Sequence, residues 1–177
     1  GQLDPAEIAT RKKRLAEKKK EQEDYEARAR AFAIRDAREI WHAAEDHDTT
    51  PAQDYLAARH CGLDPWPPTL RYLPDHPYKK MIGQRMHVLH SGPCMIAAVT
   101  NAHGRIECVH RTWIDPVRPG QKAEIRDPEG NLLKSKMTRG SKKGGVIRLT
   151  RTTNSGVIVM GEGIETTASV AAVGILP

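Results

Sequence analysis

The sequence has few aromatic residues, few cysteines and no long apolar run, and each shortage excludes a class of protein. Aromatic residues make up only 5% of the chain, so its core must be built mostly from aliphatic side chains. The three cysteines, Cys61, Cys94 and Cys108, are widely spaced and form no CxxC pair. This spacing argues against a disulfide scaffold or a zinc knuckle and fits a reducing cytoplasm. The apolar runs are far shorter than the ~20 residues of a membrane helix, so no span is expected. The eight histidines lack the partners of a zinc site, and none is assigned to a metal.

Positive charge is abundant and unevenly distributed. The formal net charge is +6 and the pI is about 9.3, which is typical of proteins with a polyanionic partner. Residues 131–151 contain seven basic side chains, and no acidic residue follows until Glu162. The basic residues are Lys134, Lys136, Arg139, Lys142, Lys143, Arg148 and Arg151. We interpret this segment as a phosphate-binding loop, and a solubilising surface loop is the alternative.

The N-terminal part of the sequence predicts one long helix. Residues 5–46 lack glycine, with Asp4 as a candidate N-cap and Pro5 in the first turn. Residues 11–30 carry nine basic and five acidic residues, so we expect this half to be solvated. The second half has apolar residues at helical spacing that predict a stripe packed on a core: Ala33, Ala37, Ile40, Trp41 and Ala44.

A second, short helix is predicted after this one. Thr50 or Thr49 is suited to its N-cap and Pro51 to its first position, and Gly62 is suited to end it. Tyr55 and Leu56 would then face the interior.

Strand signals follow the helices. Residues 94–99 and 105–111 flank a turn at residues 101–104, where Gly104 is suited to a positive φ, and this pattern predicts a hairpin. A weaker hairpin signal lies at residues 127–131. Further strands are predicted at residues 70–73, 146–150 and 156–160. The last is apolar on both faces, as is typical of a strand inside a sheet covered on both sides.

Glu162 follows this apolar strand and precedes Gly163 and a helical run. A carboxylate at the end of a central strand lies where open α/β sheets bind ligands, and there it would handle a metal ion or a proton. The same residue also fits an acid at the start of a helix, which the helix dipole favours. The residues alone leave both interpretations open.

This last segment resembles a known family. Residues 157–163 and the helix after them are similar to the first strand, glutamate and helix of the Toprim domain, which bacterial-type primases, topoisomerases and some nucleases share. The resemblance covers roughly residues 35–177 and is greatest to phage- and plasmid-borne Toprim primase-like proteins. The segments that carry it are residues 37–41, 50–56, 70–72, 110–116, 144–149 and 162–166. A Toprim nuclease or topoisomerase would need cleavage chemistry that this chain does not show.

The resemblance implies roles for particular residues. Glu162 matches the family glutamate that acts as general acid/base or metal partner, and Arg111 and Lys136 match basic positions that face template or nucleotide. Thr166 stands where replicative primases have Asp, with Glu165 one position earlier, and the Asp-x-Asp metal motif would follow beyond the last residue. Because Mg²⁺ needs several oxygen ligands, Glu162 and Glu165 would make only an incomplete site.

We therefore expect a piece of a longer DNA primase, a nucleotidyltransferase that makes short primers on single-stranded DNA with Mg²⁺ or Mn²⁺. This chain alone is expected to bind no cofactor and to make no primer. Expected partners are single-stranded DNA, nucleoside triphosphates and a replicative helicase, in the cytoplasm and away from membranes. The expected nucleic-acid or nucleotide contacts are Arg111, Lys134, Lys136, Arg139, Lys142, Lys143 and Arg148.

The predicted fold class is α+β. A charged helical arm at residues 1–46 precedes a basic, mostly antiparallel domain at residues 47–152. Residues 153–177 would be the truncated start of a Toprim α/β domain. The alternative function is a non-catalytic DNA-binding or assembly module of a replication or mobile-element protein, with the long helix joining a helicase or another protomer.

Overall fold

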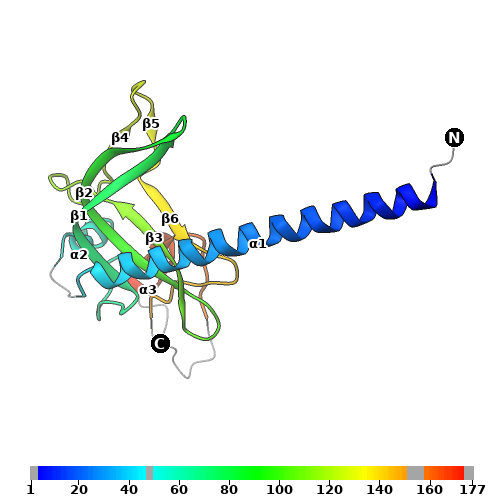
Figure 1. The fold of residues 1–177 in the computed structure, drawn as a ribbon. Helices are drawn as coiled ribbons and strands as arrows, with labels where there is room; N and C mark the ends of the chain where they lie inside the picture. The colour runs from blue at the N-terminus through cyan, green and yellow to red at the C-terminus, as the bar shows by residue number, and fades with distance from the viewer. Residues whose placement is uncertain (1–3, 47–49, 151–157, 174–177) are drawn as a thin grey trace.

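Two layers of helix enclose one antiparallel sheet in the computed structural model, which describes residues 4–46, 50–150 and 158–173 (Figure 1). The helices are α1 (Pro5–Ala43), α2 (Pro51–Ala57) and α3 (Ile164–Ala172). The strands are β1 (Leu70–Ile82), β2 (Arg85–Thr100), β3 (Ile106–Trp113), β4 (Ile125–Arg126), β5 (Leu132–Leu133) and β6 (Lys136–Gly140). The main sheet has the order β1-β2-β3-β6, and β4 and β5 form a separate small hairpin. The predicted α+β class with a long N-terminal helix and a small antiparallel sheet is confirmed.

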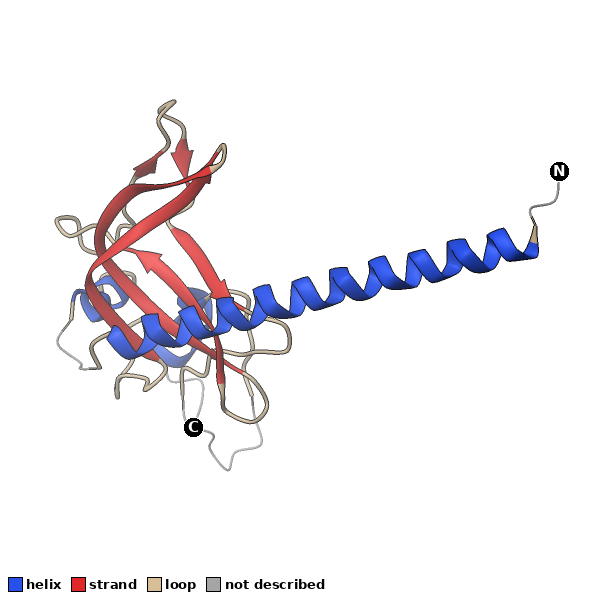
Figure 2. Cartoon of the chain, viewed as in Figure 1, coloured by secondary structure: helices blue, strands red, loops and turns tan. Residues whose placement is uncertain are grey.

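Strand β2 lies inside the sheet and contributes side chains to both of its faces. Met95 and Ala97 belong to a core cluster with residues of α2 and α3, whereas Ile96 and Ala98 belong to a second cluster with residues of α1. This division follows the two-residue period of a strand. The sheet is therefore covered on both faces, and Figure 2 shows α1 crossing one of them.

Helix α1 has the two halves that the sequence predicts. The Asp4 carboxylate accepts a hydrogen bond from the backbone N–H of Ala6 at 3.0 Å, which confirms the N-cap. The first half extends away from the body, as Figure 1 shows. In the second half, Ala37, Trp41 and Ala44 are buried against the sheet, which confirms the predicted stripe. The Trp113 side chain is fully buried in the same cluster.

Helix α2 ends earlier than predicted. Thr50 precedes it as N-cap and Tyr55 and Leu56 are buried, but the helix stops at Ala57 rather than near Gly62. The chain turns away from the helix at His60, whose φ of 58° is left-handed. Histidine is found in this conformation more often than most residues other than glycine.

Both predicted hairpin turns are present. Gly104 has a φ of 74° between β2 and β3, and Gly130 has a φ of 85° between β4 and β5. The predicted strand at residues 70–73 is the start of the much longer β1. A register shift between Leu73 and His76 places Pro74, which has no N–H to donate, outside the paired ladder.

Two predicted strands are corrected. Of residues 146–150, only Val146 forms a bridge, to Thr100. In the predicted strand at 156–160, residues 156 and 157 lie outside the described part of the chain, and the rest form no strand. Ile158 and Met160 are 78% and 84% exposed, and none of the described strands pairs with this segment. The predicted helix that follows is α3, and Ile164 and Ala168 pack it against the sheet.

None of the helices in the described part of the chain is both long enough and apolar enough to cross a bilayer.

Candidate nucleic-acid interface

The basic segment predicted to bind phosphate follows a fixed path across one end of the sheet. After edge strand β6, the N–H of Ser141 donates to the carbonyl of Glu107 at 2.8 Å. Val146 and Thr100 then exchange two backbone hydrogen bonds, of 2.9 and 3.0 Å. The Thr69 hydroxyl donates to the carbonyl of Arg148. The segment is therefore anchored in turn to β3, to β2 and to the residue before β1.

Five basic side chains gather at this end, which is also where the turn between β2 and β3 lies. We call Arg38, Arg105, Lys142, Lys143 and Arg148 the cationic end of the sheet. All five residues are exposed, and no carboxylate of the described residues forms an ion pair with any of them. Arg148 donates to the Thr100 hydroxyl at 2.6 Å and Arg38 to the carbonyl of Ile106 at 2.8 Å, so these two guanidinium groups are held in place.

The acidic residue beside the cationic end is turned to another partner. Glu107 is half-buried and accepts a hydrogen bond of 2.7 Å from the side-chain amide of Asn101. Next to it, Arg38, His42 and Arg105 line a shallow depression between α1 and the hairpin turn, together with Gly104 and Ile106. Because this lining contains no carboxylate, an anion that enters it meets only positive or neutral groups.

Two predicted contacts, Arg139 and Arg111, lie on the face of the sheet that α1 covers. The Arg139 guanidinium pairs with Asp36 of α1 at 2.5 Å and lies 5.5 Å from the centre of the Phe32 ring. Arg111 is only 8% exposed and stacks over Trp113 at 5.3 Å. Arg139 thus fastens α1 to β6, and Arg111 lies inside the core rather than at the surface.

Arg111 also shapes the chemistry of a buried histidine. One of its terminal nitrogens lies 3.4 Å from Nε2 of His76, and the other donates to the carbonyl of Thr138 at 3.5 Å. Burial and the charge of Arg111 lower the pKa of His76 to about 4, so this ring is neutral at pH 7. Burial also lowers the pKa of Arg111.

Lys136 and Glu165 meet in a separate cluster on the opposite face. The Lys136 ammonium is 2.8 Å from one carboxylate oxygen of Glu165, and Lys122 is 3.3 Å from the other. The Tyr55 hydroxyl donates to Glu165 at 2.7 Å. Burial alone would raise the pKa of Glu165, but the hydrogen bonds from Lys136 and Tyr55 outweigh it and hold that pKa well below its usual range. Burial and the bond to Glu165 raise the pKa of Tyr55 far above its ordinary value.

The remaining predicted contact, Lys134, lies in the link between β5 and β6, before the first residue of β6. Lys134 is exposed, and its carbonyl accepts a hydrogen bond of 3.1 Å from the Tyr78 hydroxyl. Lys134 therefore lies away from the cationic end, to which only Lys142, Lys143 and Arg148 of the predicted set contribute.

The two carboxylates expected in the incomplete metal site, Glu162 and Glu165, lie in different surroundings. Both oxygens of Glu165 already face cations, and an added Mg²⁺ would be repelled by Lys122 and Lys136. Glu162 is exposed just before the N-cap of α3 and forms no ion pair within the described part of the chain. No three His, Cys, Asp or Glu side chains of the described residues are grouped as metal ligands would be.

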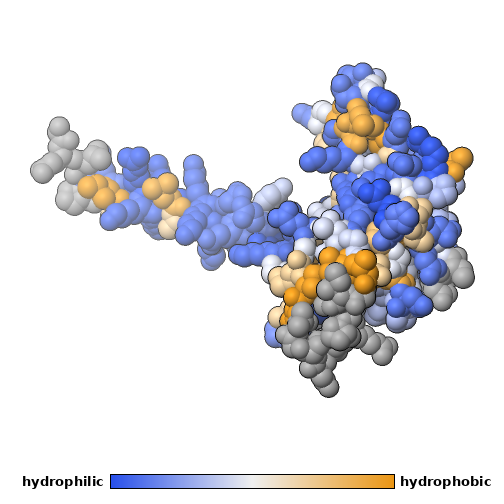
Figure 3. Space-filling model, turned by 180° about the vertical axis from the view of Figure 1, so that it is seen from behind, coloured by the Kyte–Doolittle hydropathy of each residue, from blue (hydrophilic) through white to orange (hydrophobic). Residues whose placement is uncertain are grey.

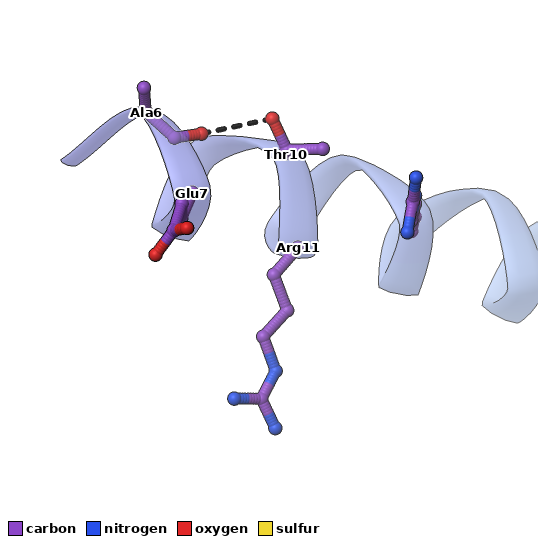
Figure 4. A pocket seen from close by; sticks show the side chains of 5 residues that line it. Ala6, Glu7, Thr10 and Arg11 are labelled. Carbon is purple, nitrogen blue, oxygen red and sulfur yellow. Dashed lines mark hydrogen bonds between the residues drawn. The ribbon is translucent and has the colours of Figure 1, made fainter. Parts of the chain in front are cut away.

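A further depression lies on the first turns of α1, far from this end of the sheet. Figure 4 shows Thr10 donating to the carbonyl of Ala6, at 2.9 Å, while Arg11 extends away from the helix. Every described residue that lines it, from Ala6 to Arg14, belongs to α1, so the described part of the chain offers a ligand no second wall there.

Sequence reasoning missed Arg38, Arg105 and Lys122 as members of these clusters. Arg105 carried a local signal, because a basic residue directly after a tight turn is normally exposed. Arg38 and Lys122 carried none, because their neighbours come from distant parts of the chain: the carbonyl of Ile106 and the carboxylate of Glu165.

Fold and site together define a small α+β domain whose cationic end has no ion-pair partner among the described residues. Residues 31–149 match a family described as a domain of unknown function (DUF7146), and the chain belongs to that family. The matched region runs from the docked half of α1 through the basic segment, so it includes the whole cationic end. No curated protein and no solved structure matches the chain.

Proposed function

We propose that this chain binds single-stranded DNA through the cationic end of its sheet. The observation that carries the proposal is the set of five exposed basic side chains at that end, none of them paired with a described carboxylate. A phosphate backbone that reaches these side chains releases its condensed counterions, which favours binding of any sequence. Contacts of this kind position a strand without reading its bases.

The fixed positions of two of these side chains support a specific path for the strand. Arg148 is held by Thr100 and Arg38 by the carbonyl of Ile106, so both guanidinium groups are oriented before a ligand arrives. Lys142 and Lys143 lie in the anchored segment, after the edge strand β6 and before Arg148. They directly precede Gly144, which has a positive φ. The proposed path runs along this end from the α1 side to the start of β1.

We further propose that the parent protein is a Toprim primase-like nucleotidyltransferase, in which this chain holds the template. The support is the resemblance of residues 35–177, together with a helix, α3, that begins directly after Glu162 and Gly163. In this proposal the exposed Glu162 is the carboxylate that reaches the reaction centre, and Glu165 has a structural role. Mg²⁺ or Mn²⁺ would be held mainly by ligands that Glu162 and Glu165 do not supply.

The second candidate is a DNA-binding or assembly module without catalytic activity. The observation that favours it is the saturation of Glu165 by Lys122, Lys136 and Tyr55, which leaves Glu162 as the single free carboxylate at the start of α3. An assay of primer synthesis by the longer parent protein distinguishes the two candidates. A primase should make primers and lose this activity on Glu162→Gln, whereas a module without catalytic activity should make none.

The binding proposal is tested by the salt dependence of affinity for a fluorescent oligo(dT). The triple variant Arg105→Ala, Lys142→Ala, Lys143→Ala removes three cations from the cationic end. It should reduce the slope of log K against log salt by about 2, since each single-strand phosphate contact contributes roughly 0.7. The matched control, Lys79→Ala, Lys80→Ala, Arg85→Ala, removes three cations from the tip of the β1–β2 hairpin, at the other end of the sheet. It should leave the slope unchanged, and equal losses in the two variants would contradict the proposed location.

A further inference from the structure

The protruding half of α1 exposes four large apolar side chains that belong to neither core cluster of the described residues, and among them Phe32 is contacted by Arg139 of β6 on one side of its ring. Residues 6–32 are exposed along a helix whose charged side chains dominate its surface, as the hydropathy view in Figure 3 shows. Ile8, Leu15, Tyr25 and Phe32 are 39%, 59%, 66% and 52% exposed. Leaving them in water gives up the free energy that their burial would contribute.

Their spacing is that of a coiled-coil seam. Ile8 and Leu15 are seven residues apart, and so are Tyr25 and Phe32. If Ile8 and Leu15 occupy the first position of a heptad, Tyr25 and Phe32 occupy the fourth, and these two positions form the contact stripe of paired helices. The other contact positions of these heptads hold Arg11, Lys18, Gln22 and Ala29, none of them a large apolar residue, which makes a seam of limited strength.

The same four residues are arranged symmetrically about Lys20. Ile8 and Phe32 lie 12 residues on either side of it, and Leu15 and Tyr25 lie five residues on either side. Two copies of α1 that run antiparallel and cross at this point therefore bring Ile8 of each copy to Phe32 of the other, and Leu15 to Tyr25. In a parallel, in-register pair, each apolar side chain would instead face the same residue of the other copy.

The charge pattern favours the antiparallel arrangement. Residues 11–20 carry seven basic residues and one acidic residue, whereas residues 21–26 carry four acidic residues and no basic one. Antiparallel crossing at Lys20 places the acidic block of each helix beside the basic block of the other. Parallel pairing would place like blocks together, which is destabilising.

The body of the protein leaves room for this pairing. The residue opposite Asp4, where α1 begins, is Asp36, where α1 meets Arg139 and the sheet. The partner helix would thus begin where the docked half of α1 starts. We infer that residues 5–32 of α1 form an antiparallel coiled coil with the same segment of a second copy of this chain.

The oligomeric state in sedimentation equilibrium at about 10–100 μM, a range typical of modest affinities, tests the pairing. The wild-type chain should be a dimer. Leu15→Lys should raise the dimer dissociation constant at least about tenfold, because each dimer loses two apolar layers. Ala27→Lys adds the same charge on the outer face of the helix and should leave the constant within a few-fold. A monomeric wild type at the highest concentration, or equal effects of the two substitutions, would overturn the inference.

The orientation is tested by disulfide formation under mild oxidation. A mixture of chains carrying Leu15→Cys and chains carrying Tyr25→Cys should cross-link one to the other. Leu15→Cys alone should not, because two copies of position 15 would lie about 15 Å apart along the helix axis, beyond disulfide reach. Native Cys61, Cys94 and Cys108 are buried and do not compete. Self-cross-linking of Leu15→Cys would show that the two helices run parallel. Cross-linking of the mixture only when DNA is present would show that the helices do not pair by themselves. Either result would overturn the inference.

Discussion

Glu165→Gln tests whether the cluster around Glu165 holds α3 on the sheet. The substitution keeps the size of the side chain and an oxygen for the Tyr55 hydroxyl, and it removes the charge that Lys122 and Lys136 face at 3.3 and 2.8 Å. A hydrogen bond to a charged group contributes about 1.5–3 kcal/mol, whereas an exposed ion pair contributes about 0–1 kcal/mol. The Glu165 side chain is 14% exposed and the lysines about a third, so this cluster lies between the two cases. We expect the free energy of unfolding to fall by about 1–2 kcal/mol.

The assay is urea unfolding followed by circular dichroism, with Glu162→Gln as the control. Glu162 is exposed and unpaired within the described residues, so its substitution should change the free energy of unfolding by less than about 0.5 kcal/mol. The pH dependence gives a second check. Because the pKa of Glu165 is lowered in the folded state, its contribution is fully present above the ordinary glutamate pKa and is lost as the pH falls below it. The difference between wild type and Glu165→Gln should therefore be constant above about pH 5.5 and shrink below about pH 4.5. A difference under about 0.5 kcal/mol at pH 7, or one that grows in acid, would refute the reasoning.

Two further predictions concern the sheet. Gly140→Ala should lower the free energy of unfolding by more than about 2 kcal/mol, and Gly104→Ala by about 1 kcal/mol. Both glycines have a positive φ, but only at Gly140 would the new Cβ also lie 2.2 Å from a backbone atom, the carbonyl oxygen of Glu107. Similar losses for the two variants in urea unfolding would contradict this geometry. His76 should titrate near pH 4 in an NMR experiment, and stability should fall as the pH drops from about 6.5 towards 4, because the unfolded chain binds the proton that folded His76 does not. A His76 pKa near 6.5 would show that the ring is not buried beside Arg111.

The elements that the sequence predicted well are those with local signals. Asp4, the glycine-free run after it and the apolar stripe that includes Ala37 and Trp41 define α1 almost to its last residue. Gly104 and Gly130 mark turns because each needs a positive φ. In each case the evidence lies within a few residues of the element.

The errors arose where distant residues decide the outcome. The apolar run at residues 158–160 is no strand, because a strand needs neighbours, and no described strand pairs with it. Arg111 and Lys136 carry basic side chains of the kind that bind phosphate. In the fold, however, Arg111 stacks on buried Trp113 and Lys136 pairs with Glu165. Composition located the basic segment, but only the fold separates its paired cations, Lys136 and Arg139, from those with no carboxylate partner among the described residues.

The most direct test of the proposed function is to map the DNA-binding surface by NMR. Backbone amide shifts of the labelled chain would be followed as a single-stranded oligonucleotide is added. The largest changes should fall at residues 100–106 and 141–149, around Arg105, Lys142 and Lys143. Changes confined to the β1–β2 hairpin or to the protruding half of α1, or no changes at low salt, would contradict it.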